Sequence, residues 1–258
     1  MKILFLSPLP PWPLHSGGQI RVYHLLKALA LKHKITLVCY VTYDEDQGIR
    51  QELEKICEKV IVVRRRFKPW TFNALLKTLF STKPLLMNIY DLGKELAAFS
   101  DEKDLIYCEC FYLMDKIGKT STPILLGEQN IEYLAYERYL KDMVWYKKIV
   151  MWPFAQLDLL KMKYWERKMW RKADRLATVS EADRDIIAHD TGRKDVIVIP
   201  NGVDTEKFKA RETKINNKTI LFIGEFKWFP NIEAVEWLVK EIFPAIKKEV
   251  ADAKLLIA

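Results

Sequence analysis

The chain has 258 residues, 50% of them hydrophobic and 29% charged, so it is long and apolar enough to bury a sizeable core as one large or two small domains. Lysine and arginine interrupt every apolar run, which excludes the ~20 uncharged residues of a membrane-spanning helix, and the short stretch Ile3–Leu6 runs into a proline-rich loop, unlike a signal peptide. A net charge of +8 predicts an anionic partner, for which nucleic acid, a phosphorylated metabolite and an acidic membrane surface all qualify. Because the sequence shows neither a membrane-spanning run nor a signal peptide, we expect a cytoplasmic location.

In the first 200 residues, short β-rich runs alternate with longer amphipathic stretches, which is the pattern of a parallel sheet with helical crossovers. The sequence predicts an α/β fold with a doubly wound parallel sheet. The predicted strands are Lys2–Ser7, Ile35–Val41, Val60–Val63, Leu105–Glu109, Pro123–Gly127, Arg175–Val179 and Val196–Ile199.

The loop after the first strand, residues 8–18, is predicted at the carboxyl edge of the sheet, where open α/β folds bind ligands. Gly17 and Gly18 would begin the following helix, so its free amides could receive a phosphate or sugar hydroxyls, although a simple tight turn explains two glycines equally well. One face of this helix is predicted to pack on the sheet while Arg21 and Lys27 face outward. The GxGxxG spacing is absent, which argues against an oxidoreductase.

The four cysteines are predicted to be small buried hydrophobes, because they lack the CxxC pairing of a zinc site and the density of a disulfide scaffold. We predict no metal site. Ser180, followed by Asp183, is predicted to be a helix N-cap and not a nucleophile. The cysteines are Cys39, Cys57, Cys108 and Cys110.

Turn residues at 200–204 end the alternation, and the polar stretch Lys209–Lys218 is predicted to be a linker. The predicted organisation is a first domain over 1–200, a crossing over 201–218 and the start of a second domain over 219–258. That start contains a strand Thr219–Ile223, a helix from about Asn231 to Val250 and a strand Lys254–Ile257. One βαβ unit of this size cannot bury a core alone.

Four ordered segments carry a resemblance to a known family. The opening Met1–Pro8 with its Gly-Gly loop, the segment Arg167–Glu181, the crossing Ile199–Phe208 and the run Ile220–Pro244 are similar to family 4 glycosyltransferases of the GT-B fold. The resemblance implies two Rossmann-like domains: the first, acceptor-side domain and the start of a nucleotide-sugar domain. It also implies transfer with retention of anomeric configuration, of the hexosyltransferase type, with a nucleotide sugar as co-substrate, no other cofactor and no required metal.

In the family, two glutamates seven residues apart bind the donor. The corresponding positions would lie beyond Ala258. From this we expect the chain to be truncated in the donor half and inactive alone, although concerned with lipopolysaccharide, capsule or exopolysaccharide. The alternative is a non-catalytic acceptor-binding or scaffold subunit that partners a donor-domain protein. Because the last strand would lack neighbours, a homodimer or a split heterodimer is expected. Lys227 could contact a phosphate, but a solvated lysine explains it as well.

The segment Gly127-Glu128-Gln129-Asn130 departs from the His-Asn typical of relatives, where that histidine lies near the donor sugar. Gln129 can exchange hydrogen bonds but not a proton near neutral pH. Alternatively, Glu128 and Asn130 simply begin a helix over 131–139. The predicted cleft therefore has three parts. The acceptor and phosphate edge is formed by His15, Gly17, Gly18 and Arg21, and the opposite lip by Gln129 and Asn130. Asn201 and Gly202 form the predicted hinge, in a turn whose backbone geometry is expected to require these residues.

Basic residues gather with aromatic ones in Arg64–Trp70 and in the long helical region Glu137–Asp174. Such a mixture suits docking on an anionic membrane surface, which would place the protein peripherally at the inner face of the plasma membrane. A large helical insertion with buried rings and a lysine coat is the open alternative. Single-stranded nucleic acid is a third, but no nucleic-acid-binding motif accompanies the pattern.

Overall fold

The computed structural model describes residues 1–41, 46–65, 71–90, 103–142, 145–209, 218–226 and 229–258. It divides into two units, Met1–Gly202 and Val203–Ala258, each described here by itself. The region 66–70, most of the linker and Lys227 lie outside the described residues.

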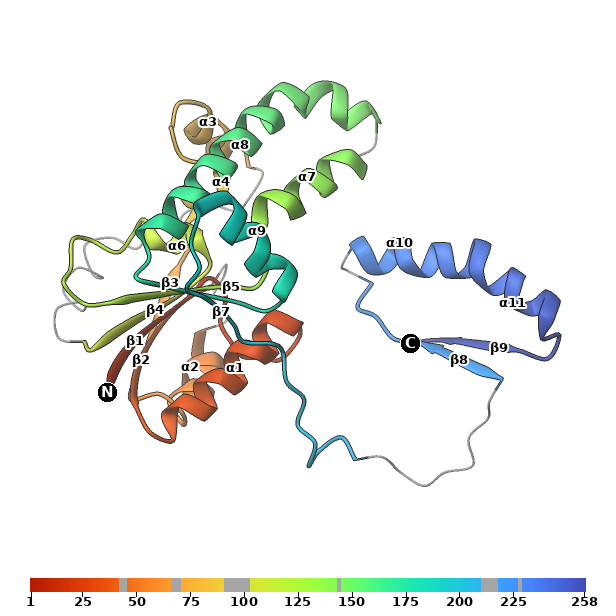
Figure 1. The fold of residues 1–258 in the computed structure, drawn as a ribbon, viewed down its shortest axis with the longest axis horizontal. Helices are drawn as coiled ribbons and strands as arrows, with labels where there is room; N and C mark the ends of the chain where they lie inside the picture. The colour runs from red at the N-terminus through yellow and green to blue at the C-terminus, as the bar shows by residue number, and fades with distance from the viewer. Residues whose placement is uncertain (42–45, 66–70, 91–102, 143–144, 210–217, 227–228) are drawn as a thin grey trace. The chain divides into compact units, whose positions relative to one another are not determined.

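The first unit is built on one parallel sheet, which confirms the predicted Rossmann-like doubly wound α/β fold (Figure 1). The seven strands lie in the order β3-β2-β1-β4-β5-β6-β7, so the winding reverses between β1 and β4. All seven predicted strands are present, with ends displaced by no more than one residue. Their bounds are β1 Lys2–Ser7, β2 Lys34–Val41, β3 Lys59–Arg64, β4 Leu105–Glu109, β5 Ile124–Glu128, β6 Arg175–Thr178 and β7 Val196–Val198.

Helices cover both faces of this sheet, as the winding requires. In Figure 1, α1 (Gly17–Ala30) and α2 (Asp46–Leu53) lie on one face, and the long α8 (Trp145–Lys172) on the other. The remaining helices of the unit are α3 Phe72–Leu79, α4 Leu85–Ile89, α6 Phe111–Met114, α7 Glu132–Asp142 and α9 Glu181–Thr191.

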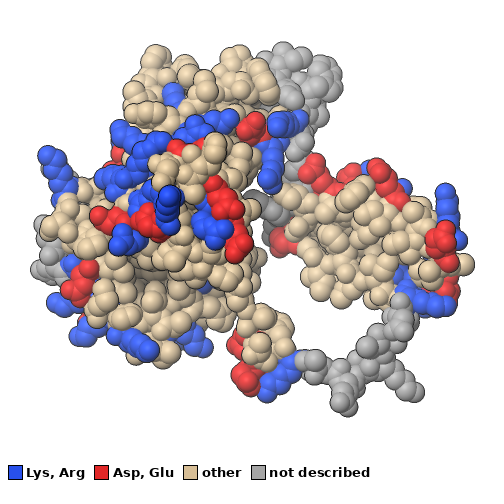
Figure 2. Space-filling view, viewed as in Figure 1, with Lys and Arg blue, Asp and Glu red and all other residues tan. Residues whose placement is uncertain are grey.

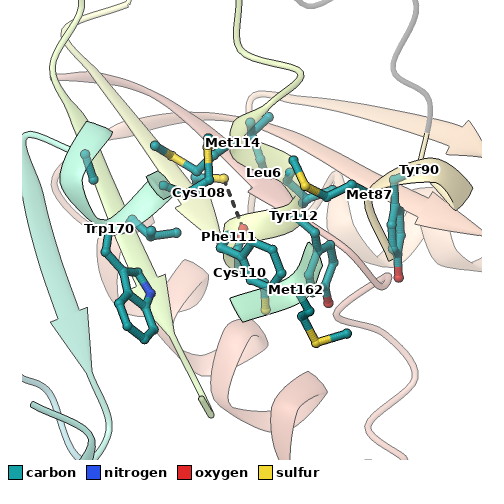
Figure 3. Close-up of a cluster of buried hydrophobic side chains, with 14 of the residues drawn as sticks. Leu6, Met87, Tyr90, Cys108, Cys110, Phe111, Tyr112, Met114, Met162 and Trp170 are labelled. Atoms are coloured by element: carbon teal, nitrogen blue, oxygen red, sulfur yellow. Dashed lines mark hydrogen bonds between the residues drawn. The ribbon is translucent and has the colours of Figure 1, made fainter. Parts of the chain in front are cut away.

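Strand side chains alternate between two hydrophobic clusters, one on each face. In β4, Tyr107 packs in the α1–α2 cluster and stacks on Phe5 of β1, with ring centroids 4.4 Å apart. Its neighbours Cys108 and Cys110 join the larger cluster beneath α8, which also contains Trp170 (Figure 3). All four cysteines are free and buried, as predicted from their spacing.

Helix α9 has both ends capped. The Ser180 hydroxyl accepts a hydrogen bond from the Asp183 amide at 3.1 Å, which confirms the predicted N-cap. Gly192 ends the helix in the left-handed conformation with φ 74°, which glycine adopts without steric strain.

The second unit pairs β8 (Thr219–Phe222) with β9 (Lys254–Ile257) in parallel, as predicted. The predicted single helix between them is instead three consecutive segments: α10 (Phe229–Trp237), a π-helical turn η2 (Leu238–Ile242) and α11 (Phe243–Glu249). Pro244 lies in the first turn of α11 and has no amide to donate, which explains why regular α-helical bonding is interrupted just before it. Across the described residues of both units, no helix is long and apolar enough to cross a membrane.

Candidate functional site

The strand order places the candidate site at the carboxyl ends of β1, β4 and β5. The winding reverses between β1 and β4, and open α/β sheets bind ligands at such a switch point. Three loops meet this edge of the sheet: residues 8–16 before α1, the turn at Cys110 after β4, and residues 129–131 after β5.

The loop before α1 is held by its own hydrogen bonds. The Ser16 hydroxyl accepts from the Gln19 amide at 3.3 Å, and the Gln19 side chain donates to the Pro10 carbonyl at 3.0 Å. Gly17 and Gly18 are therefore the first two residues of α1, as predicted. His15 and Gly17 are exposed at this edge.

Gly18 and Gln129, predicted on opposite lips of the cleft, lie against each other. A β-carbon built on Gly18 would stand 2.7 Å from the Gln129 Oε1 atom. The Gln129 Nε2 atom donates to the Glu109 Oε1 atom at 2.6 Å. The last residue of β4, Glu109, thus fixes Gln129 through its amide nitrogen and directs its carbonyl oxygen toward α1.

Glu109 was missed as a site residue, because its partner Gln129, just after β5, is 20 residues away and no local pattern joins them. The available signal was a carboxylate at the carboxyl end of a buried strand. Glu109 is 1% exposed, and burial raises its pKa while the Gln129 hydrogen bond opposes that rise. Gly127 makes room for this arrangement, since a β-carbon there would stand 2.3 Å from the Tyr107 hydroxyl and 3.2 Å from Glu109 Oε2.

On the opposite face of the sheet, two further carboxyl groups hold the segment 128–133. Glu128 accepts from the Trp170 Nε1 atom at 3.0 Å. Glu166 accepts from the amides of Glu132 and Tyr133 at 2.8 and 2.9 Å and so caps the start of α7. Glu128 therefore anchors the strand end to α8 and does not begin the helix, which starts at Glu132.

Burial dominates the electrostatics of these carboxyls. It raises the pKa of Glu166 to about 8 and that of Glu132 to about 7. The pKa of Glu128 is also raised well above its ordinary value, first by burial and then by the charge of Glu166. Asn130, between these anchors, is exposed.

Arg21 is partly exposed and outside the core, as its predicted outward position requires, but it has partners that the sequence did not predict. Its guanidinium donates to the Ile199 carbonyl at 2.7 Å, the Pro200 carbonyl at 3.1 Å and the Asn201 Oδ1 atom at 2.9 Å. Helix α1 thus holds the segment that leads toward the second unit. Sequence spacing gave no sign of this, because the partners are 178 to 180 residues away. Contact of Arg21 with an acceptor or phosphate stays a prediction.

The predicted turn at 201–202 needs a correction. Gly192 is the only described glycine with positive φ, and a β-carbon on Gly202 would meet open space. Gly202 is therefore not required by backbone geometry, whereas Asn201 is held by Arg21. The hinge function of both residues stays a prediction. No group of three histidine, cysteine or acidic side chains in the described part of the chain is placed to hold a metal ion.

Comparison with known proteins supports the resemblance to a glycosyltransferase family. Residues 144–207 match the family model of Glycosyltransferase Family 4. This range contains the segment Arg167–Glu181 and all but the last residue of the crossing Ile199–Phe208. The chain is 26% identical over its whole length to an "Uncharacterized 44.6 kDa protein in cps region" from Klebsiella pneumoniae, of which it spans 64%. The family resemblance seen in the sequence is confirmed.

Two solved structures are similar at lower identity. UGT71G1 of Medicago truncatula, complexed with UDP-glucose, is 13% identical with a TM-score of 0.47. The match covers all of this chain and 66% of that one. The glycotransferase of kitacinnamycin is 11% identical with a TM-score of 0.43, covering 99% of this chain and 64% of that one.

Proposed function

We propose that this chain, which is similar to the family 4 glycosyltransferases, takes part in sugar transfer from a nucleotide sugar to a cell-surface glycan, with retention of configuration and without a metal. The similar Klebsiella protein is named for a cps region, which supports capsule or a related polysaccharide. The first unit supplies the acceptor side of the reaction.

One observation carries the proposal: the hydrogen bond between Gln129 and Glu109 lies beside Gly18 at the switch point of the sheet. The first turn of α1 directs backbone amides and the positive end of its dipole toward the same edge. A phosphate or a sugar hydroxyl bound there would accept hydrogen bonds from the amides of α1, and a sugar hydroxyl would also donate one to the carbonyl oxygen of Gln129.

In this site Gln129 orients a sugar and cannot take its proton, because an amide does not titrate near neutral pH. Glu109 acts through Gln129: its carboxylate accepts one amide hydrogen at 2.6 Å and so fixes which end of the amide faces the ligand. Loss of either side chain should therefore weaken sugar binding in the same way.

The test is calorimetric titration of the purified chain with UDP, GDP and their common sugar conjugates. We expect wild type to bind one nucleotide sugar more tightly than the bare nucleotide, and Gln129→Ala and Glu109→Ala to remove that preference. Gln51→Ala, on an exposed position of α2, is the matched control and should bind as wild type does.

Absence of nucleotide binding at millimolar ligand would refute a donor role for this chain. Binding of a glycan acceptor without any nucleotide would instead favour the acceptor-binding subunit. Equal loss of affinity in Gln129→Ala and Gln51→Ala would refute the assignment of the site.

A further inference from the structure

Large apolar side chains are exposed on two neighbouring helices of the first unit, α3 and α8. We call this region the α3–α8 surface. In α3 and its C-cap, Phe72 is 76% exposed and Phe80 is 83% exposed. In α8, Leu160 is 64% and Tyr164 60% exposed. The surface also includes Leu76, Leu79, Trp152 and Leu157.

Helical geometry gathers these side chains on the outward side of each helix. In α3, Phe72, Leu76 and Leu79 are three or four residues apart, while Ala74 and Thr78 on the opposite side are fully buried. In α8, Leu157, Leu160 and Tyr164 follow the same spacing. Each helix therefore has one side in the protein core and an apolar stripe facing away from it.

Two hydrogen bonds hold α8 against the end of α3. The Lys161 amine donates to the Thr78 carbonyl at 2.7 Å, and the Trp165 Nε1 atom donates to the Thr82 carbonyl at 2.8 Å. The two apolar stripes thus belong to one rigid pair of segments, which Figure 1 shows side by side on the α8 face of the sheet.

The exposed charges within these two segments are basic, although some are paired with carboxylates of other elements. Lys83 binds Asp115 at 2.6 Å, Lys163 binds Glu137 at 3.3 Å and Arg167 binds Asp190 at 2.7 Å. Residues 72–83 contain no acidic residue, and the only acidic residues in 151–172 are Asp158 and Glu166, which are 1% and 0% exposed. Every lysine and arginine of the same segments is at least partly exposed. These residues are Lys77, Lys83, Lys161, Lys163, Arg167, Lys168, Arg171 and Lys172.

Lysine and aromatic side chains are also in direct contact. The Lys168 amine lies 4.4 Å from the centre of the Trp165 ring and 5.6 Å from that of Tyr164. The tan area at the top of Figure 2, over α3 and the neighbouring part of α8, is bordered by lysine and arginine. Aromatic rings next to amines are the arrangement that settles at the headgroup depth of a bilayer.

From this combination we propose that the α3–α8 surface docks on an anionic lipid bilayer. Phe72, Phe80 and the leucines enter the boundary between headgroups and acyl chains, and the lysines bind lipid phosphates. A nucleic acid fits less well, because the exposed groups include many aliphatic side chains that offer no stacking platform for bases. Docking does not depend on sugar transfer, so either proposal can fail without the other.

The experiment measures binding of the purified chain to phosphatidylcholine vesicles with and without phosphatidylglycerol, by co-sedimentation at low and physiological salt. We expect binding to be at least about tenfold tighter on the anionic vesicles and to weaken with salt. Phe72→Ser combined with Phe80→Ser should reduce the partition coefficient at least about tenfold. Leu31→Ser is the matched control, because Leu31 is 83% exposed at the C-cap of α1, outside this surface.

A second pair tests the charge. Lys168→Gln should weaken binding to anionic vesicles, whereas Lys27→Gln, on an exposed position of α1, should not. Unfolding in urea checks that all variants fold, which is expected because each altered side chain is exposed.

Four results would overturn the proposal: no binding to anionic vesicles, equal effects of the surface and control variants, displacement of the chain from vesicles by single-stranded RNA at equal charge, or loss of a dimer in Phe72→Ser/Phe80→Ser without any vesicle binding.

Discussion

A methyl group added at Gly18 should uncouple Gln129 from Glu109. In Gly18→Ala the new β-carbon stands 2.7 Å from Gln129 Oε1, well inside van der Waals contact. The obstacle is the end of a flexible side chain, so Gln129 moves and the protein still folds. The movement breaks the 2.6 Å hydrogen bond from Gln129 to the buried Glu109 carboxylate.

The expected loss of stability in Gly18→Ala can be worked out, and Gly17→Ala is its matched control. A hydrogen bond to a charged group contributes about 1.5–3 kcal/mol, and replacing glycine by alanine in a helix returns about 0.5–1 kcal/mol. Gly18→Ala should therefore lower the free energy of unfolding by about 0.5–2.5 kcal/mol. Gly17→Ala has nothing within 4 Å of the new β-carbon, so it should be neutral or slightly stabilising.

Urea unfolding of wild type, Gly17→Ala, Gly18→Ala, Gln129→Ala and the Gly18→Ala/Gln129→Ala double variant measures this coupling. Once Gln129 is an alanine, the methyl at Gly18 meets no amide, so the double variant should be no less stable than Gln129→Ala alone. A coupling energy of about 1.5–3 kcal/mol is expected. Strict additivity of the two substitutions, or equal stability of Gly17→Ala and Gly18→Ala, would refute the contact.

Three further substitutions test other parts of the structure. Gly127→Ala should destabilise the protein more than Gly18→Ala does, because the hydroxyl 2.3 Å from the new β-carbon belongs to the buried, stacked Tyr107; a smaller loss in urea unfolding would contradict this. Burial raises the pKa of Asp158 to about 6, and the unfolded carboxyl titrates near ~4, so stability is lost as pH rises between these values. Asp158→Asn keeps an acceptor for the Leu85 amide 2.8 Å away and should gain up to about 3 kcal/mol at about pH 8, and an unchanged pH profile would count against it. Arg21→Lys should speed amide hydrogen exchange at Ile199, Asn201 and Gly202, because a single amine cannot replace the two guanidinium nitrogens that bind this segment. Unchanged exchange would show that these bonds do not hold the segment.

The strands could be predicted from sequence because their signal is local. A parallel sheet buried on both faces requires continuous apolar runs, and those runs fix the strand bounds to within about one residue of the structure. The cap at Ser180 was predictable for the same reason, since its partner Asp183 is three residues away. The π-helical turn at Leu238–Ile242 was not, because apolar periodicity does not distinguish it from a continuous α-helix.

The candidate site could be predicted only in part. Gly18 and Gln129 were found through the family resemblance, and Gly18 also through the position of its loop. Glu109 was missed, and so were the partners of Arg21. Both act through partners far away in the sequence, at 20 residues for Glu109 and 178 to 180 for Arg21. Only the strand order, which brings β1, β4 and β5 together, reveals these pairs.

Helix α1 joins the candidate site to the crossing segment. Gly18 contacts Gln129 in its first turn, and three residues later Arg21 binds the carbonyls of Ile199 and Pro200. Because residues three apart on a helix are neighbours, one rigid turn carries both contacts. A change that breaks only the first contact should leave hydrogen exchange at 199–202 unaltered, whereas a displacement of the whole helix would change both. Comparing Gly18→Ala with Arg21→Lys by exchange therefore shows whether α1 is a fixed support of the site or an element that moves with the crossing segment.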